Sequence, residues 1–533
     1  MEAYGDRMSD TVGAEKRPAS LPPNKSVIAW EEVPMAYIGL DVGTTGSKAT
    51  VIARDGRALS SAYREYNLRF PAPGHVELRP SDVWEAVKTV LREVAATSGE
   101  PIEALAAASF GEAVAHIGRD GKPVCDSIFF TDVRGSGELD DLRAAVDADE
   151  LMRTSGMPIN FMFTLPKLLW MQKNRPELLE KTEKILPYSG YVAYMLSGEC
   201  TADGSLASRT LLFDRFRGDW NPETLKAFGI PRAWLPDYVP AGHPVGKMLP
   251  SVARELGIQG SPIIVSGVHD QIAAALGAGA LRPGQAADGI GSAECITSVL
   301  PDDMDLKGMF RYNICAEPHA VPGRYLALVF NNTAGAALKW YRDQFAAELR
   351  DRCRLEGTSA YDELNKSISE APSPVLFLPH LGGTGTPHMD AEAKGMLAGL
   401  TLSTTASDVY RAILEGMCYE MRLNLELLER FGMRFDALTA GGGGASPEAL
   451  RLRADILGLP ITRTREPQAG TVGMAMLCAL ATGQFSSFDE AAAALVHPGE
   501  TYAPDGRFKA QYDERFEQYK RMYSASRAVY GRS

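Results

Sequence analysis

The residues best suited to chemistry begin with an eight-residue stretch, 41–48, that reads DVGTTGSK. Its two glycines free the backbone for positive φ angles and for close approach of a ligand, and its hydroxyl groups can donate hydrogen bonds. Lys48 supplies a positive charge, and Asp41 can hold a metal ion or the waters around it. This composition suits the binding of a polyphosphate.

The stretch departs from a Walker A loop, because the spacing G-x-x-x-x-G-K-[ST] is absent. The flanking runs 37–40 and 49–53 are apolar and β-branched, and the turn residues Arg54, Asp55 and Gly56 follow. We therefore expect a strand, a tight loop, a second strand and a hairpin turn. Considered alone, the stretch can also be a plain hairpin whose turn residues are polar.

Asp270 follows the apolar run 262–265 and precedes a helix of small residues at 272–279. A carboxylate at such a strand end can accept the proton of an attacking hydroxyl group. Asp is also a good helix N-cap, and the two roles are compatible. We expect the neighbouring His269 to have a packing role rather than to be a pH-sensitive partner, because adjacent strand residues point to opposite faces.

A run of four glycines, 441–444, is followed by Ala445 and Ser446 and then by a predicted helix at 447–457. Bare backbone of this kind lets a flat ligand lie against it, and a glycine loop at a helix start can bind an anion. As a dinucleotide fingerprint the run is incomplete, because Ser446 stands in place of the third glycine and no strand ending in a ribose-binding acid follows. A tight strand-to-helix turn is the structural alternative.

The elements that must position these residues alternate between strand-like apolar runs and helical patterns, which predicts α/β architecture. A second glycine-centred strand and turn at 288–292 repeats the strand and glycine-containing loop that begin at residue 37. We predict strands that include 104–110, 263–267, 375–379 and 438–444, and helices at 84–95, 165–171, 406–431, 447–457, 470–482 and 512–530.

The segment 277–284 is rich in Gly, Ala and Pro, and we place a crossover between domains near Leu281. The predicted domains are therefore 36–281 and 282–533. The first 35 residues mix charges, prolines and small residues without periodicity, so we interpret 1–35 as a mobile extension.

The composition of the 533 residues excludes several classes of protein. With 45% hydrophobic residues, disorder is excluded for most of the chain. The 55 basic and 67 acidic residues give a net charge of −12, which argues against a nucleic-acid footprint or a polybasic membrane patch. The seven cysteines contain no C-x-x-C pair, and no stretch reaches the roughly 18 apolar residues of a membrane span. We expect a soluble cytoplasmic protein that binds a small molecule.

Taken together, these motifs resemble the FGGY carbohydrate kinases, the group of xylulokinase, glycerol kinase and gluconokinase, whose folds belong with hexokinase, actin and the heat-shock ATPases. The agreement runs from about residue 37 to residue 502. In order, the matching segments read YIGLDVGTTGSKA, GHVELRPSDVW, FTDVR, LPKLLWMQKNRPE, GVHDQIAAALGAG, GIGSAE, GGTGTPHMD with AKGMLAGLT, VYRAILEGMCYE, GGGGAS and the helix at 473–483.

The resemblance implies an α/β fold in which two actin-like (ribonuclease H-like) ATPase domains flank a central cleft, and an ATP-dependent kinase of a small sugar or polyol. Asp270 would be the catalytic base, and Asp41 would act on Mg²⁺ through water. Phosphoryl transfer is mostly positioning plus charge neutralisation, so a base, a metal and two phosphate loops suffice. The residues implied to bind ATP are Gly43, Thr44, Thr45, Lys48, Gly291, Ser292, Gly335, Gly442, Gly443 and Ser446.

For the acceptor, Glu112 occupies the place where glycerol kinases carry a Glu that holds substrate hydroxyls, and Asp270-Gln271 is also the glycerol-kinase pairing. The Arg that precedes this Glu in glycerol kinases is here Gly111. We infer a less crowded pocket that takes a four- or five-carbon ketose or polyol, with glycerol a poor substrate. The residues assigned to acceptor binding are Glu112 and Gln271, with Glu77 and Asp132 as further candidates; Glu77 can also be an ordinary surface acid.

Two other functions stay open. One is an actin-fold, nucleotide-dependent sensor or assembly protein without sugar turnover, although the presence of both Asp270 and Glu112 favours the enzyme. The other, an NAD(P)-dependent oxidoreductase, is disfavoured because the opening strands lack the βαβ fingerprint. The expected partner is a small-molecule sugar or polyol, with no nucleic acid and no membrane. The sequence leaves the oligomeric state open, a homodimer included.

Overall fold

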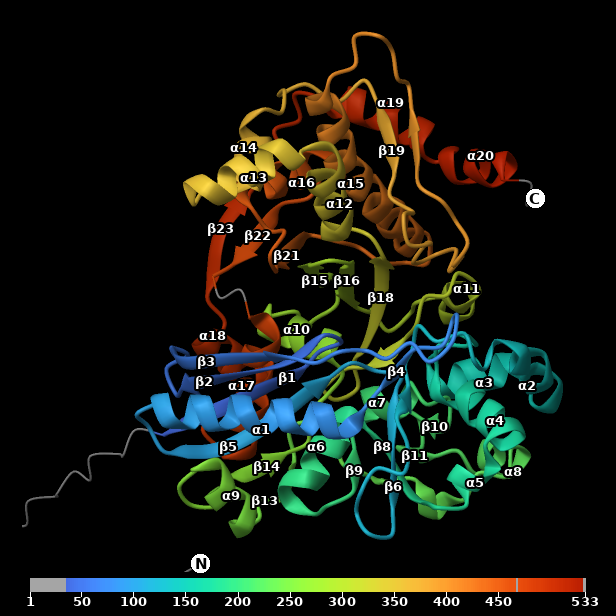
Figure 1. Cartoon of the computed structure of the whole chain (residues 1–533), viewed down its shortest axis with the longest axis vertical. Coiled ribbons are helices and arrows are strands. Elements are labelled where there is room, and N and C mark those ends of the chain that lie inside the picture. Colours follow the sequence, from blue (N-terminus) through green and yellow to red (C-terminus); the bar gives the residue numbers. More distant parts are fainter. Residues whose placement is uncertain (1–34, 466–467, 531–533) are drawn as a thin grey trace, which may run out of the picture. The chain divides into compact units, whose positions relative to one another are not determined.

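The two strands that flank the 41–48 loop, β1 and β2, are neighbours in a six-stranded sheet (Figure 1). The computed structural model describes residues 35–465 and 468–530, so the extension predicted at 1–35 lies, except for Met35, outside the described residues. β1 runs antiparallel to β2 and parallel to β5, and it places Asp41 opposite Lys48. The predicted strand, loop and strand are confirmed. The sheet order is β13 (Pro244–Lys247), β14 (Ile263–Val265), β5 (Ile102–Ser109), β1 (Ala36–Val42), β2 (Gly46–Ala53) and β3 (Ala58–Glu65).

A second sheet of seven strands repeats this topology. Its first three long strands form an antiparallel meander, β15–β16–β18, and β21 and β22 then add in parallel beside β15. The repeat predicted from the glycine-centred turns is therefore confirmed. The order is β17 (Glu317–Pro318), β18 (Tyr325–Asn331), β16 (Glu294–Val299), β15 (Gln285–Ile290), β21 (Ala437–Gly441), β22 (Ile461–Thr464) and β23 (Pro498–Tyr502).

Most of the predicted helices are present, with ends shifted by a few residues. They are α1 (Pro80–Thr97), α4 (Thr164–Asn174), α15 (Ala406–Arg430), α16 (Pro447–Leu457) and α17 (Ala469–Ala481). α15 begins with a capping box, in which Thr405 and Asp408 exchange hydrogen bonds with each other's backbone N–H. The predicted helix at 512–530 is instead two helices, α19 (Lys509–Tyr519) and α20 (Met522–Val529), and the break between them leaves both Tyr519 and Met522 buried.

The first sheet is covered on both faces by helices from distant parts of the chain. Alternate residues of a strand point to opposite faces, and every residue of β1 except Asp41 is buried. Ile38 and Leu40 belong to the apolar cluster that also holds the buried side of α1. Tyr37 belongs to a different cluster, with residues of α17, which packs against β1 and β5. A helix from the last fifth of the sequence therefore completes the core of the first sheet.

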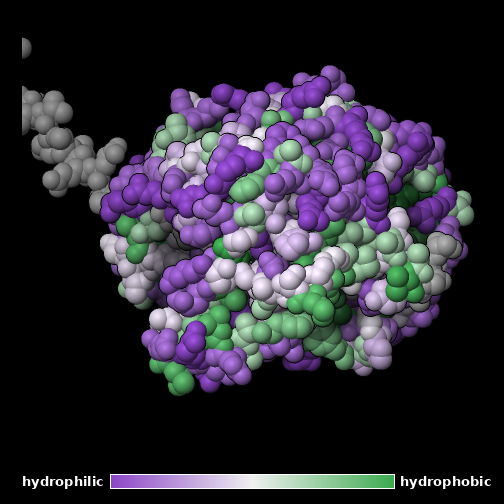
Figure 2. Space-filling model, turned by 90° about the horizontal axis from the view of Figure 1, so that it is seen from above, coloured by the Kyte–Doolittle hydropathy of each residue, from purple (hydrophilic) through white to green (hydrophobic). Residues whose placement is uncertain are grey.

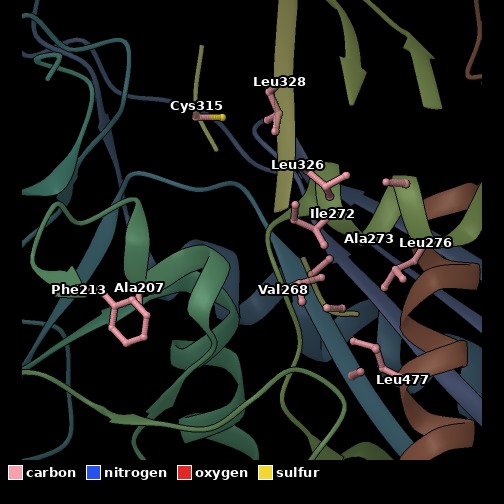
Figure 3. Packing of buried hydrophobic residues seen from close by; sticks show 14 of the residues in the cluster. Ala207, Phe213, Val268, Ile272, Ala273, Leu276, Cys315, Leu326, Leu328 and Leu477 are labelled. Atoms are coloured by element: carbon pink, nitrogen blue, oxygen red, sulfur yellow. The ribbon is translucent and has the colours of Figure 1, made fainter. Parts of the chain in front are cut away.

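α17 also packs closely along α10 (Asp270–Gly277). A Cβ atom added at Gly473 or at Gly277 would collide with a backbone carbonyl of the opposite helix, so both positions need glycine. Leu276 of α10 points toward Leu477 of α17, and Ile272 of α10 lies near Leu326 of β18 (Figure 3). The predicted boundary near Leu281 thus follows a helix that touches both sheets, and the position of the boundary stays a prediction.

The other elements surround these two sheets. No helix among the described residues is long and apolar enough to cross a membrane. Seen from above, the surface is largely hydrophilic, with hydrophobic residues gathered in a smaller area toward one edge (Figure 2).

The other helices are α2 (Leu139–Ala145), α3 (Ala148–Ser155), α5 (Pro176–Leu179), α6 (Tyr188–Ser197), α7 (Gly204–Ser208), α8 (Pro222–Ala227), α9 (Pro250–Leu256), α11 (Leu306–Arg311), α12 (Gly335–Phe345), α13 (Ala347–Glu356), α14 (Ala360–Lys366) and α18 (Phe488–Leu495). The short strands are β4 (Glu77–Leu78), β6 (Val114–Gly118), β7 (Ser127–Ile128), β8 (Thr182–Pro187), β9 (Thr201–Ala202), β10 (Phe213–Asp214), β11 (Asp219–Trp220), β12 (Asp237–Tyr238), β19 (Leu376–Leu378) and β20 (Met396–Ala398).

Candidate active site

A cleft of about 950 Å³ lies where the ends of β1 and β5 and the start of α10 meet β16 and β18 of the second sheet. A neighbouring cavity of about 330 Å³ shares Asp41 and Gln271 with the cleft and is also lined by Gly291 and Gly442. The cleft therefore joins segments that are remote in sequence. The predicted site residues that line it are Asp41, Gly43, Thr44, Thr45, Lys48, Glu112, Asp270, Gln271 and Ser292.

The first loop is held in shape by its own backbone and by Tyr66. The N–H of Gly43 donates to the carbonyl of Gly46 at 3.0 Å, which closes the turn between β1 and β2. Tyr66 donates a hydrogen bond from its hydroxyl to the carbonyl oxygen of Gly43. Thr45 lies at the exposed tip of the loop, and Thr44 is half-buried. The loop is thus a fixed turn whose side chains border the cleft.

Asp41 is the last but one residue of β1, and its carboxylate borders both the cleft and the smaller cavity. Its Oδ1 atom is buried and has no hydrogen-bond partner among the described residues. Burial raises the pKa of Asp41 to about 7, with a further increase from the charge of Asp270 and an opposing effect of Lys48. Burial also disfavours the charged form of Lys48, and it therefore lowers the pKa of this residue. A buried carboxylate oxygen without a partner is suited to a cation or to its water shell.

The second loop, between β15 and β16, is packed against two of the predicted glycines. The N–H of Gly335, the first residue of α12, donates to the carbonyl of Gly291 at 3.0 Å, and a Cβ at Gly335 would lie 2.6 Å from that oxygen. Gly442 has a φ angle of +96°, and a Cβ there would lie 2.6 Å from the carbonyl oxygen of Ile290. These two glycines let the backbone close around the second loop.

The other two predicted nucleotide residues lie further along the glycine run. A Cβ at Gly443 would meet no atom within 4 Å, so its backbone faces open space. The hydroxyl of Ser446 caps α16 by accepting a hydrogen bond from the N–H of Ala449 at 3.3 Å. Pro447 follows at the first helical position, where its missing N–H costs nothing. Ser446 thus has a structural task, and its contact with nucleotide stays a prediction.

Asp270 is the first residue of α10, and it leaves the N-cap position to His269. No side-chain capping hydrogen bond forms there, so the structural alternative for Asp270 is not realised. The side chain of Asp270 is about a quarter exposed, at 24%, and it faces the cleft. Burial raises the pKa of Asp270, His269 opposes this, and Glu112 adds to it. The carboxylate is therefore both accessible and placed in a low-dielectric setting.

Glu112 is held by an arginine that the sequence did not point to. Arg209 donates from Nε to Oε1 of Glu112 at 2.9 Å, and its Nη2 donates to the same oxygen. Its Nη1 donates to Oε2 of Glu317 at 2.6 Å. The hydrogen bonds in the described part of the chain leave Oε2 of Glu112 unused, so this oxygen can accept a hydroxyl from a ligand.

Two expectations about this end of the cleft are wrong. The space next to Gly111, expected to be open, contains the side chain of Arg209: a Cβ at Gly111 would lie within 3.0 Å of Nε and of Cδ. His269, expected to pack, instead lies between two carboxylates, with Nε2 3.2 Å from Oδ1 of Asp270 and Nδ1 3.0 Å from Oε1 of Glu317. The rule that adjacent strand residues point to opposite faces does not apply to His269, because this residue is the N-cap of α10.

The order of the motifs and the paired sheets correspond to a known family. Residues 36–277 match the N-terminal domain, and residues 308–482 the C-terminal domain, of the FGGY family of carbohydrate kinases. The chain belongs to this family. It is a phosphotransferase with an alcohol group as acceptor and ATP as its other substrate. A nucleotide-dependent sensor without turnover is therefore not favoured.

Similar proteins cover nearly the whole of this FGGY kinase. A xylulose kinase of Lactococcus lactis subsp. lactis (strain IL1403) is 27% identical over 498 residues, which are 92% of this chain and 97% of that protein. A gluconokinase of Bacillus subtilis (strain 168) is 29% identical over 463 residues, 85% and 88% of the two chains. The crystal structure of gluconate kinase from Lactobacillus acidophilus superposes with a TM-score of 0.84 at 24% identity, covering 93% of this chain and 99% of that one. The fold with two actin-like domains is confirmed.

In this FGGY kinase, Glu77 and Asp132 do not line the cleft. Both are bound to Arg134, which donates from Nη1 to Glu77 at 2.8 Å and from Nη2 to Asp132 at 2.6 Å. Although burial opposes it, these hydrogen bonds and those from backbone N–H groups lower the pKa of Asp132. Glu77 and Asp132 therefore bind Arg134 beside the cleft, and neither lies where it would bind a hydroxyl group of the acceptor.

Arg209 and Glu317 are the residues of the FGGY kinase site that sequence reasoning missed. They lie in the unremarkable segments SLASRTL and CAEPH. Arg209 is 97 residues from Glu112 and 108 residues from Glu317, and neither separation forms a motif. The one available signal was the acidic Glu317 among mostly apolar neighbours. Their pairing follows from tertiary structure, because β17 packs against α7, which ends just before Arg209.

Proposed function

We propose that this FGGY kinase transfers the γ-phosphate of ATP to a hydroxyl group of an uncharged four- or five-carbon ketose or polyol. Family membership leaves both uncharged and anionic acceptors as candidates, because the Lactococcus relative is a xylulose kinase and the Bacillus relative a gluconokinase. The observation that separates them is the charge pattern at the acceptor end of the cleft.

No basic side chain among the described residues lining the cleft is left for an anionic acceptor. The donors of Arg209 bind Glu112 and Glu317, His269 faces two carboxylates, and Lys48 belongs to the loop that we assign to the phosphates of ATP. A sugar acid would bring its carboxylate toward Glu112 and Asp270 without a free cation, which is costly in a buried site. Hydroxyl groups can instead donate hydrogen bonds to both carboxylates.

The chain length of the acceptor is proposed from the relatives. The matched xylulose kinase spans 92% of this chain, and the Glu112 carboxylate suits a vicinal diol of the kind found in pentuloses and in tetritols or pentitols. Arg209 fills the space beside Gly111, so that space no longer supports a longer acceptor. The acceptor-binding roles of Glu112 and Gln271 rest on their place in the cleft.

In the proposed reaction, the oxygen of the acceptor hydroxyl attacks the γ-phosphorus and its proton passes to the Asp270 carboxylate. The bond between the γ-phosphorus and the β–γ bridging oxygen breaks, and ADP leaves. The 41–48 loop, with the hydroxyls of Thr44 and Thr45 and the charge of Lys48, would hold the β- and γ-phosphates on one side. Gly291 and Ser292 would hold them on the other. The glycines at 335, 442 and 443 would border the remainder of the nucleotide, with Ser446 at the adenosine end.

The residues also fit Mg²⁺. Asp41 offers a buried carboxylate oxygen without a partner, and oxygen ligands are those that Mg²⁺ prefers. The described residues contain no cluster of three or more potential metal ligands, which agrees with an ion held mainly by nucleotide and water, with Asp41 acting through water. When bound, Mg²⁺ supplies charge neutralisation at the phosphates.

A panel of acceptors in a coupled ADP-release assay tests this proposal. The panel contains glycerol, erythritol, xylitol, arabinitol, xylulose, ribulose, fructose and gluconate, with Asp270→Asn enzyme as the control for contaminating kinases. We expect an uncharged four- or five-carbon compound to give the highest kcat/KM. Gluconate as the best substrate would refute the charge argument, and glycerol or fructose as the best would refute the chain length.

A further inference from the structure

Five side chains of alternating charge form a continuous series along the acceptor end of the cleft. Asp270 Oδ1 lies 3.2 Å from His269 Nε2, and His269 Nδ1 lies 3.0 Å from Glu317 Oε1. Glu317 Oε2 accepts from Arg209 at 2.6 Å, and Arg209 donates from Nε to Glu112 at 2.9 Å. The series therefore joins the proposed base to the proposed acceptor ligand.

The surroundings of His269 favour its protonated form. Both of its ring nitrogens lie within 3.2 Å of carboxylate oxygens, and an ionised carboxylate only accepts hydrogen bonds. The Nδ1 contact with Glu317 is an ion-pair contact without the alignment of a hydrogen bond. Although burial opposes it, the charges of Glu317 and Asp270 raise the pKa of His269, while Arg209 lowers it. Cation and anion consequently alternate along the whole series, and each of the two cations is shared by two carboxylates.

Glu317 is the centre of the series and the one member supplied by the second sheet. It lies on β17, is fully buried at 0% exposure, and touches both cations. The other four members come from the ends of β5, α7 and the start of α10. Since both cations are buried as well, a single carboxylate keeps them apart and directs each toward its second partner.

We infer that Glu317 is a positioning residue for the acceptor: it directs Arg209 onto Glu112 and His269 onto Asp270, so that the second half of the chain sets the two carboxylates that meet the sugar. The inference rests on the proposed roles of Asp270 and Glu112. Glu317 touches no reacting atom, and its effect passes through the two cations. Among the described residues, no hydrogen bond or ion pair joins the side chains of the series to the 41–48 loop or to the second phosphate loop.

The test is Glu317→Gln, which keeps the size of the side chain and removes its charge. Steady-state kinetics are measured against both substrates, with whichever acceptor of the panel is best. We expect kcat/KM for the acceptor to fall about 10- to 100-fold and KM for ATP to change less than twofold. Glu317→Asp, which keeps the charge, should recover part of the loss.

The matched control is Glu415→Gln. Glu415 is an equally buried carboxylate, paired with Arg411 at 2.7 Å on α15 and absent from the cleft lining. This variant removes the same charge from a buried ion pair, and it should leave acceptor kinetics at the wild-type level. Thermal unfolding of both variants shows whether each is folded.

A double-mutant cycle separates positioning from general damage. If Glu317 acts through Arg209 on Glu112, then Glu317→Gln combined with Glu112→Gln should lose less than the product of the two single losses. Should Glu317→Gln fail to fold, Arg209→Lys carries the same expectation, because it keeps a charge but loses the planar fork that reaches both carboxylates. Wild-type acceptor kinetics in folded Glu317→Gln, an equal rise in KM for ATP, or the same acceptor defect in Glu415→Gln would overturn the inference.

These outcomes are distinct from failure of the proposed function. Near-normal turnover by folded Asp270→Asn would remove the proposed base, whatever Glu317 does. An unexpected best acceptor would change the substrate class while leaving the Glu317 test intact, because the test uses the acceptor that the panel identifies.

Discussion

Adding a single methyl group at Gly111 should disturb acceptor binding without touching the nucleotide. A Cβ at this position would lie 2.5 Å from Cδ of Arg209, whereas ordinary contact begins at 3.4 Å, so the arginine must move by about 1 Å. This displacement breaks or stretches the 2.9 Å hydrogen bond from Nε to Glu112. The perturbation therefore acts on the acceptor-facing carboxylate.

The size of the effect follows from the bond that is lost. Hydrogen bonds to charged groups contribute about 1.5 to 3 kcal/mol. At about 1.4 kcal/mol for each factor of ten, Gly111→Ala should lower kcat/KM for the acceptor by about 10- to 150-fold. KM for ATP should stay near its wild-type value, because the added methyl group would meet Arg209 and no atom of either phosphate loop is among its nearest neighbours.

The assay is coupled ADP release at varied acceptor and at varied ATP, with circular dichroism to verify folding. Gly137→Ala is the control, since a Cβ there would meet no atom within 4 Å and the residue lies outside the cleft lining. Unchanged acceptor kinetics in folded Gly111→Ala protein would refute the reasoning that Arg209 occupies this space and holds Glu112.

Four further predictions concern the catalytic cleft. Asp270→Asn should lose about 10²- to 10⁴-fold in kcat while still binding acceptor by calorimetry, and near-normal turnover would exclude Asp270 as the base. Glu112→Ala should weaken acceptor kcat/KM by about 2 to 4 kcal/mol with ATP binding intact, and wild-type kinetics would contradict its role. Because burial raises the pKa of Asp270 and His269 opposes this, activity should fall as the pH drops through that raised pKa; His269→Gln should move the acid limb of the kcat/KM profile to higher pH, and an unmoved limb would argue against the pair. The acceptor should tighten nucleotide binding in titrations, since both loops close on ATP, and an affinity unaffected by the best acceptor would count against closure.

Local patterns in the sequence were sufficient to predict the parts of the fold that local forces determine. The glycine-centred turns at 41–48 and 288–292 marked the two hairpins, and the capping signal at Ser446 marked the start of α16. Apolar periodicity located α15, although it joined α19 and α20 into one helix. These features depend on residues only a few positions apart.

The features that the sequence did not reveal depend on contacts between distant residues. Arg209 reaches Glu112 and Glu317 across about a hundred residues in each direction, and no spacing rule connects them. Asp132 is a different case: its partner Arg134 is only two residues away in the segment FTDVR, but the other partner of Arg134, Glu77, is 57 residues from it. Charged side chains can choose among many partners, and tertiary structure makes that choice.

The place of α17 on the first sheet has a consequence for how the chain matures during synthesis. The helix ends at Ala481, so the ribosome adds 204 residues (481 minus 277) between the end of α10 and the completion of the helix that covers β1 and β5. At about 5 to 20 residues per second this takes roughly 10 to 40 s, during which the apolar side of the sheet that holds Tyr37 is without its cover. A fragment that stops at Gly277 would keep that side uncovered, so the segment 36–277 requires residues 469–481 to complete its core.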